Sequence, residues 1–465
     1  MTAPFLDNEG RRLLGFTLDN APILEPSPGM SSIIYAAAGG GKTTCVSSTT
    51  IQSLLASTTL SLVINDVKQG EIAHQIAEMC ARYGRKFGVI DPFHVMGADY
   101  PFRIELNAFG SAVDLGEDET DDFPFAVEKI LFSLIDEPAD DAKNKYWRDG
   151  PREICEFGVK TLHRHSPRLC TPGGLCAFLS NPRTLASAME LEADDPESPV
   201  RDIALQLLDM REHNAEHYVQ HVRAALTALK LFSFGKLRDD GMRADITHRE
   251  LVEDGWIVCL VNPIRYADRL GPYFAQHLLS FMGAQLSGAG RAVYVLDEFC
   301  NAPLRELVER ITVFRAFDAS ALYITQSRQD VVRKYGEKET AVLEDNCAIK
   351  QWLKFSNFED AERVSKAMGE TLHVARTLGT GSERLDLNDS MAVGREPLMS
   401  PHELMAMPAE NQVLHVAGVG FLYCKKVRQN QIAPTCFKLA PNPLEGGRLE
   451  PDPKVVLPTP DGSER

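Results

Sequence analysis

A glycine-rich segment that ends in a lysine and two threonines lies near the N-terminus. Residues 36–44 read Ala-Ala-Ala-Gly-Gly-Gly-Lys-Thr-Thr, after an apolar stretch at 31–35 and before a helix-compatible stretch at 43–56. A strand, a glycine-rich turn and a helix in this order predict a phosphate-binding loop, or P-loop. The flanking elements count against the alternative, which is a glycine-rich turn with an accidental lysine.

The residues of this loop have separate expected roles. Glycines allow the backbone amides to point inward around phosphates, and the N-terminus of the following helix favours negative charge. The lysine would bridge the β- and γ-phosphates of ATP, the first threonine would bind Mg²⁺, and the second would donate near the α-phosphate. These residues are Gly39, Gly40, Gly41, Lys42, Thr43 and Thr44. Ala36 stands where the usual pattern has glycine, which is tolerable if its φ is negative.

A second apolar strand ends in two carboxylates. Val-Tyr-Val-Leu at 293–296 is followed directly by Asp297 and Glu298. In P-loop enzymes a strand of this kind presents the Walker B acid beside the nucleotide. We expect Asp297 to hold Mg²⁺ through water and Glu298 to polarise the attacking water. A strand end with a capped turn is the common alternative, and the P-loop earlier in the chain favours the functional interpretation.

A polar amide follows the next expected strand. The stretch 321–325 is apolar and ends at Gln326. An amide at the tip of the strand beside Walker B could sense the γ-phosphate or orient water. A surface glutamine after a strand is an equal alternative on the residues alone.

Strand and helix signals alternate around these motifs, and this alternation predicts an α/β fold with a mostly parallel, doubly wound sheet. From 114 to 238 the strand signal stops and apolar residues recur at helical spacing, which predicts an inserted all-α domain. The nucleotide-binding domain would then comprise 1–113 and 239–433. Proline, glycine and charge dominate 434–465, which predicts a disordered tail. The expected strands are 31–35, 60–65, 87–90, 256–261, 292–296, 321–325 and 349–353.

Composition limits the classes of protein that fit. The chain has 465 residues and a formal net charge of −16, which argues against a surface that generally attracts nucleic-acid backbones. No run approaches the roughly 18 to 20 apolar residues that span a bilayer, so no intrinsic membrane span and a cytoplasmic location are expected. The ten cysteines include no Cys-x-x-Cys pair, so we expect them to be reduced and not to bind metal.

The order of motifs resembles the type IV coupling proteins, the conjugation and secretion ATPases of the TraD and TraG kind. The segment 66–71 is similar to the family's Asp-x-Lys-Gly-Glu, with Gln69 as an extra residue, and each later piece follows in family order. A single matching segment is weak evidence for the family, but the succession of all the segments in the family's order is specific for it. The matching segments are 66–71, 91–93, 106–109, 296–299, 314–317, 324–327, 344–347 and 397–404.

This resemblance implies a RecA-like P-loop ATPase that works as a homo-hexamer, with a helical domain that meets substrate. It implies that Arg315 is an arginine finger that reaches a neighbouring subunit's nucleotide, although a helix C-terminal arginine that satisfies carbonyls is nearly as good an interpretation. Arg328 is a second candidate. Many family members carry N-terminal membrane spans and this sequence begins almost at the motor, so docking at the inner membrane would depend on partners.

The implied function is a motor that brings DNA–protein complexes or effector proteins to a type IV secretion or conjugation channel. Its partners would be channel components, a relaxase or effector client, and single-stranded DNA. Basic residues Arg328, Arg333 and Lys334 would face a pore or would form a solvated helix face. Two alternatives stay open: a double-stranded DNA pump, and a nucleotide-binding adaptor without turnover.

Overall fold

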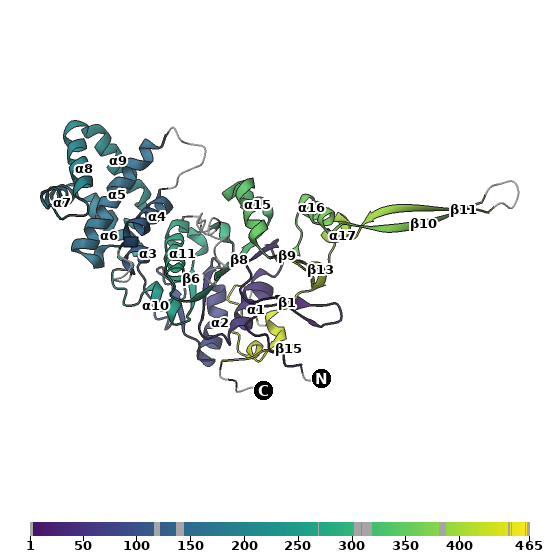
Figure 1. The fold of residues 1–465 in the computed structure, drawn as a ribbon. Helices are drawn as coiled ribbons and strands as arrows, with labels where there is room; N and C mark the ends of the chain where they lie inside the picture. The colour runs from purple at the N-terminus through teal and green to yellow at the C-terminus, as the bar shows by residue number, and fades with distance from the viewer. Residues whose placement is uncertain are drawn as a thin grey trace.

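The computed structural model describes residues 3–115, 121–135, 144–267, 269–301, 308, 319–380, 387–444, 447, 449–460 and 462. Within these ranges a large sheet forms the centre of the molecule, a helical lobe lies at one end, and a long hairpin projects from the other (Figure 1).

The central sheet has 11 strands in the order β2-β1-β13-β12-β9-β3-β8-β7-β4-β6-β5. All neighbouring strands from β9 to β5 pair in parallel, whereas β12, β13, β1 and β2 add an antiparallel edge. The predicted α/β fold with a mostly parallel sheet is therefore confirmed. The strands are β1 (Leu13–Phe16), β2 (Pro22–Leu24), β3 (Ser32–Ala36), β4 (Leu60–Asp66), β5 (Phe87–Ile90), β6 (Ile257–Val261), β7 (Arg291–Leu296), β8 (Ala319–Thr325), β9 (Ile349–Lys354), β12 (Asn411–Val416) and β13 (Gly420–Lys425).

The parallel strands are buried on both faces, because successive side chains point to opposite sides of the sheet. Ile33 packs into one hydrophobic core and its neighbour Ile34 into another. The core around Ile34 is completed by α1 (Ser48–Leu54) and α2 (Glu71–Arg82), and the core around Ile33 by α10 (His248–Glu253) and α11 (Gly271–Leu286). Helices on both faces make this a doubly wound sheet.

The helical lobe follows β5 in the chain and precedes β6. The core that covers one face of the sheet continues into this lobe through residues such as Phe157 and Leu207. Among the described residues, every regular element between α3 and α10 is helical, and the exact limits of 114 and 238 stay a prediction. The helices are α3 (Gly110–Val113), α4 (Phe123–Leu134), α5 (Tyr146–His165), α6 (Pro172–Ser180), α7 (Pro182–Asp194), α8 (Arg201–His213) and α9 (Ala215–Ala228).

The prediction of a disordered tail from 434 is wrong for the part of it that the structure describes. The two-residue strand β15 (Val455–Val456) pairs in parallel with β14 (Ile432–Ala433). Cys436, Leu439 and Leu457 are buried. These apolar residues are too far apart in sequence to show a period. Leu439 packs into the core that α1 and α2 complete, and Leu457 packs with Leu13 and Phe16 of β1.

A long antiparallel hairpin extends from the antiparallel edge of the molecule (Figure 1). Its strands β10 (Glu370–Thr380) and β11 (Leu387–Pro397) pair continuously from Glu370–Pro397 to Thr380–Leu387. The remaining helices lie between β8 and β12 in sequence: α14 (Arg328–Tyr335), α15 (Glu337–Asn346), α16 (Phe358–Met368) and α17 (Pro401–Met405).

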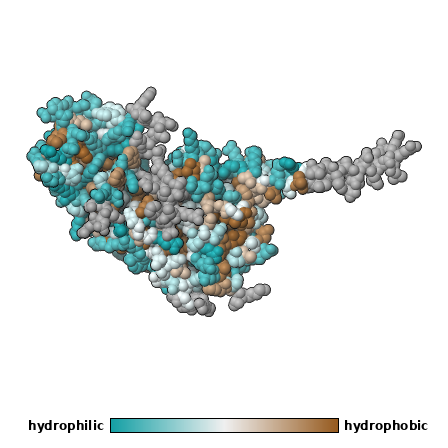
Figure 2. All heavy atoms as spheres, in the orientation of Figure 1, coloured by the Kyte–Doolittle hydropathy of each residue, from teal (hydrophilic) through white to brown (hydrophobic). Residues whose placement is uncertain are grey.

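The visible surface of the helical lobe is mostly hydrophilic (Figure 2). None of the helices among the described residues is long and apolar enough to cross a membrane. All ten cysteines are buried, and none of them forms a disulfide among the described residues.

Asp66 at the end of β4 provides a test of stability against pH. Its carboxylate accepts hydrogen bonds from the amides of Ile72 and Ala73 (2.8 and 2.9 Å) at the start of α2. Burial is the main cause that raises the pKa of Asp66 from 3.8 to about 7. Between these pH values the native chain holds a proton that the unfolded chain has lost, so the free energy of unfolding falls as pH rises.

The side chain in the Asp66→Asn variant cannot ionise. The variant is therefore expected to lack this fall in the free energy of unfolding. The melting temperature of the variant, measured relative to the wild type by circular dichroism, should rise by a few degrees between pH 5 and pH 8. If the melting temperatures of the two chains instead change with pH in the same way over this range, the pKa of about 7 for Asp66 is wrong.

Candidate nucleotide-binding site

The predicted P-loop connects β3 with a helix at the carboxyl edge of the parallel sheet. Gly39 and Gly41 have φ values of 71° and 94°, a region that glycine enters without the penalty of a side chain. Ala36 is the last residue of β3, so it keeps an extended backbone. The helix begins with a wide turn at Thr43–Ser47 and continues as α1. The loop therefore has the strand–turn–helix geometry that phosphate binding requires.

The two carboxylates after β7 lie beside this loop. Asp297 is only 1% exposed, and Glu298 is partly buried with a φ of 48°. Lys42 Nζ forms an ion pair with Glu298 Oε1. Gln326 Nε2, at the end of β8, donates to the same oxygen at 3.2 Å. The structure thus brings Lys42, Glu298 and Gln326 together, because β8 lies between β3 and β7 in the sheet.

Thr43 and Asp297, the residues expected to share Mg²⁺, are connected through Lys68 in the turn after β4 and Glu71 at the start of α2. Thr43 Oγ1 donates to Glu71 Oε2 at 3.4 Å. Lys68 Nζ lies 3.8 Å from Glu71 Oε2 and 3.9 Å from Asp297 Oδ2. A continuous series of polar contacts therefore runs from Thr43 through Glu71 and Lys68 to Asp297, at the end of the site where Mg²⁺ is expected.

Asp297 is electrostatically unusual. Burial raises its pKa from 3.8 to about 6, and the positive charge of Lys68 opposes this rise. Within the described ranges neither carboxylate oxygen of Asp297 has a hydrogen-bond partner. A buried carboxylate without such partners is costly unless a cation approaches it. Together with the hydroxyl of Thr43 it offers the hard oxygen ligands that Mg²⁺ prefers, so these residues fit a Mg²⁺–nucleotide complex.

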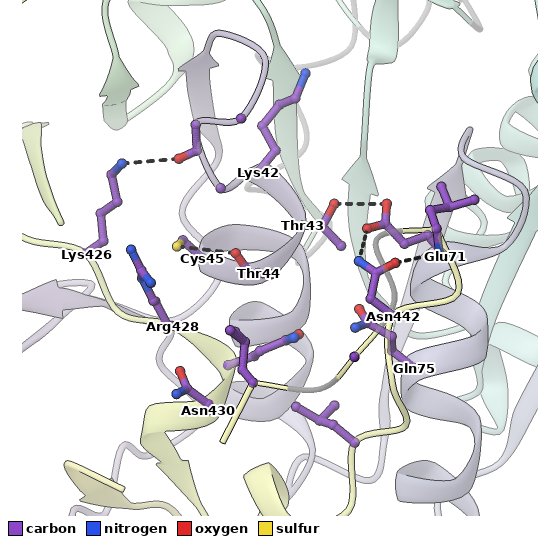
Figure 3. A pocket seen from close by; sticks show the side chains of 18 of the residues that line it. Lys42, Thr43, Thr44, Cys45, Glu71, Gln75, Lys426, Arg428, Asn430 and Asn442 are labelled. Carbon is purple, nitrogen blue, oxygen red and sulfur yellow. Dashed lines mark hydrogen bonds between the residues drawn. The ribbon is translucent and has the colours of Figure 1, made fainter. Parts of the chain in front are cut away.

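A cavity of about 560 Å³ opens at the P-loop (Figure 3). Its opposite wall is formed by described residues between Lys426 and Leu449. Lys426 Nζ donates to the Gly40 carbonyl at 3.2 Å, and Asn442 Nδ2 donates to Glu71 Oε1 at 2.6 Å. Arg428 also lines the cavity, on the side of Thr44 and Cys45. The sequence alone predicted no role for these residues or for Glu71 and Lys68. The only signal for Glu71 and Lys68 in the sequence was the resemblance of the segment 66–71 to the family's Asp-x-Lys-Gly-Glu.

The two arginine-finger candidates have different outcomes. Arg315 lies outside the described residues, and its role stays a prediction. Arg328 is already paired with acids of its own chain, because it donates to Glu344 Oε2 at 3.0 Å and to Glu337 Oε1 at 2.6 Å. Its side chain is 13% exposed. These bonds argue against both a finger role and a pore-facing role for Arg328, whereas Arg333 and Lys334 are exposed on α14.

Comparisons with known proteins show similarity over part of the sequence and over most of the fold. Residues 291–409 match the family described as the TraM recognition site of TraD and TraG. This range includes both Walker B carboxylates and Gln326. The chain is 27% identical over 141 residues to the conjugal transfer protein TraG of Rhizobium radiobacter, and 23% identical over 158 residues to the protein VirD4 of Rhizobium rhizogenes.

The chain is therefore similar, over these ranges, to proteins of the TraG and VirD4 kind. The TraG and VirD4 alignments cover 29% and 33% of this chain, and they span only 22% and 24% of the relatives. The structural likeness is broader. The plasmid coupling protein TrwB in complex with ADP and Mg²⁺ has a TM-score of 0.64 at 14% identity, and the match covers 92% of this chain and 94% of that chain. At this identity the match shows that the fold is shared.

Proposed function

We propose that this protein is a type IV coupling protein, an ATP-hydrolysing motor that brings DNA–protein complexes or effector proteins to a type IV secretion or conjugation channel. The observation that carries the proposal is the meeting of Lys42, Glu298 and Gln326 at the P-loop, with the buried Asp297 beside them. ATP and Mg²⁺ are the proposed cofactors. Solved structures of TrwB with ADP and Mg²⁺ and with an ATP analogue support this choice.

The contacts in the site suggest how turnover begins. Lys42 and Glu298 pair with each other, so an incoming β- and γ-phosphate would take over Lys42 and release the carboxylate of Glu298. Glu298 can then accept a proton from the attacking water. The amide of Gln326 holds the same carboxylate and orients it. Bound Mg²⁺, held by Thr43 and Asp297, would neutralise charge on the phosphates.

The proposed assembly is a homo-hexamer in the cytoplasm at the inner membrane, in which Arg315 reaches the nucleotide of a neighbouring subunit. The helical lobe of α4 to α9 would meet the client. The net charge of −16 favours clients with basic surfaces over general binding to DNA. The similarity to TraG and VirD4 supports the channel components and the relaxase or effector as partners.

Turnover of ATP by the purified full chain tests the proposal. It should be measured alone, with a single-stranded oligonucleotide, with duplex DNA, and with a relaxase bound to a single strand. We expect the last addition to stimulate turnover most, and Lys42→Ala to lower turnover at least about 10²-fold in every condition.

Two results would overturn the proposal. Stimulation by duplex DNA alone would favour a double-stranded DNA pump. Nucleotide binding without any turnover above that of Lys42→Ala would favour an adaptor.

A further inference from the structure

The buried carboxylate of Glu71 faces two different parts of the chain. Glu71 is the first residue of α2 and is 4% exposed. Its Oε2 accepts from the Thr43 hydroxyl at 3.4 Å, whereas its Oε1 accepts from the Asn442 amide at 2.6 Å. Figure 3 shows Glu71 between these two partners, one on the P-loop helix and one on the C-terminal segment. Its Oε2 therefore lies where Thr43 would hold the metal.

A positive charge already lies at this end of the site. Lys68 Nζ is within 4 Å of both Glu71 and Asp297, at 3.8 and 3.9 Å. Asp297 is buried, and among the residues that the structure describes its two carboxylate oxygens have no hydrogen-bond partner. The ammonium of Lys68 thus lies between two buried acids. A divalent cation could interact with the same acids more strongly, because it carries twice the charge.

The C-terminal segment holds Asn442 against the helix that carries Glu71. The Ala440 amide donates to the carbonyl of Gln75 on α2 at 3.1 Å, and Leu439 is buried in the core beneath α2. Asn442 and Glu71 are therefore fixed to the same helix, although 371 positions separate them in sequence. The bond from Asn442 engages Oε1 and leaves Oε2 directed towards Thr43.

We propose that Glu71 is a further metal-site residue of the nucleotide pocket and that Asn442 is its positioning residue. This inference rests on the proposed function, since it concerns the same Mg²⁺–nucleotide complex. On this proposal the C-terminal segment is a functional part of the site, because its Asn442 supplies the hydrogen bond that orients Glu71 beside Thr43.

The test measures how much Mg²⁺ strengthens nucleotide binding. The affinity of the full chain for a fluorescent ADP analogue is measured with Mg²⁺ and with EDTA, and the ratio of the two dissociation constants is compared between variants. We expect Glu71→Gln and Asn442→Ala to lower this ratio about 10-fold or more, because outer partners of metal ligands typically change metal affinity 10–100-fold. Affinity in EDTA should stay near that of the wild type.

Two further variants separate a positioning role from a general structural role. Asn346→Ala changes an exposed asparagine at the end of α15, outside the cavity, whose amide donates to the Val342 carbonyl at 2.9 Å, and it should keep the wild-type ratio. Asn442→Gln retains an amide donor and should recover part of the ratio that Asn442→Ala loses. Binding of Mn²⁺ with ADP, followed by electron paramagnetic resonance, gives the same comparison without the fluorescent group.

The outcomes distinguish this inference from the proposed function. If Glu71→Gln and Asn442→Ala melt like the wild type and keep its ratio, the inference is overturned while the motor proposal stands. If the wild-type chain binds no nucleotide at all, both are overturned.

Discussion

Replacing Glu298 by glutamine is expected to lower the turnover number for ATP by about 10²- to 10⁴-fold, the range typical of a lost general base. Glutamine has nearly the same shape as glutamate but cannot accept a proton from the attacking water. ATP should bind at least as tightly, because Lys42 no longer has to leave an ion pair with Glu298 before it meets the phosphates. Steady-state turnover, with ATP binding measured separately, gives both quantities.

A matched variant shows whether this effect belongs to the site. Glu362 is partly exposed on α16 and pairs with Lys366 at 3.1 Å, far from the P-loop in sequence. Glu362→Gln removes the same charge and should leave turnover unchanged, since exposed ion pairs contribute little. If Glu298→Gln hydrolyses ATP at the wild-type rate, another group activates the water and the role given to Glu298 is wrong.

The parts of the site that the sequence predicted are those set by local pattern. The P-loop and the Walker B carboxylates each follow a short apolar run, and parallel strands bring their carboxyl ends to one edge of a sheet. For Gln326 the residues alone left two equal interpretations, a role beside the γ-phosphate and a surface glutamine after a strand. The contact with Glu298 required the strand order β3-β8-β7, which composition and periodicity do not specify.

The residues that the sequence missed reach the site over long distances in the chain. Glu71 meets Asn442, and the P-loop carbonyl of Gly40 meets Lys426 across 386 positions. No periodicity links such partners, because each contact depends on how the complete sheet closes. Among them only Lys68 and Glu71 lay in a segment with a family resemblance.

The C-terminal segment was misjudged for a physical reason. Proline, glycine and charged residues dominate its composition, and this is typical of disorder. A few well-placed apolar side chains are nevertheless enough to hold a segment against an existing surface. Leu439 packs beneath α2, and Val455 and Leu457 pack with β1. Such a segment needs no core of its own, so composition alone does not reveal its order.

A chain that ends after Ala433 is therefore expected to be substantially less stable. It loses the buried side chains of Cys436, Leu439, Val455 and Leu457. Burial of such a side chain contributes roughly 1.5–3 kcal/mol as an upper estimate. The amide of Gln52 also loses its bond to the Thr435 hydroxyl (2.8 Å) inside the protein. A decrease in melting temperature of about 10 °C or more is expected by calorimetry.

A second shortened chain isolates the cause of this decrease. Ending the chain after Thr459 removes only residues beyond Leu457, whose amide donates to the Ala433 carbonyl at 2.9 Å. This chain should melt like the complete protein, because β15 and every buried apolar side chain named above are retained. Equal melting temperatures for the chain that ends at Ala433 and the complete chain would mean that 434–459 contributes no stability, and would contradict the packing described. A decrease confined to the shorter chain would instead support the packing of this segment against α1 and α2, where it lines the nucleotide pocket.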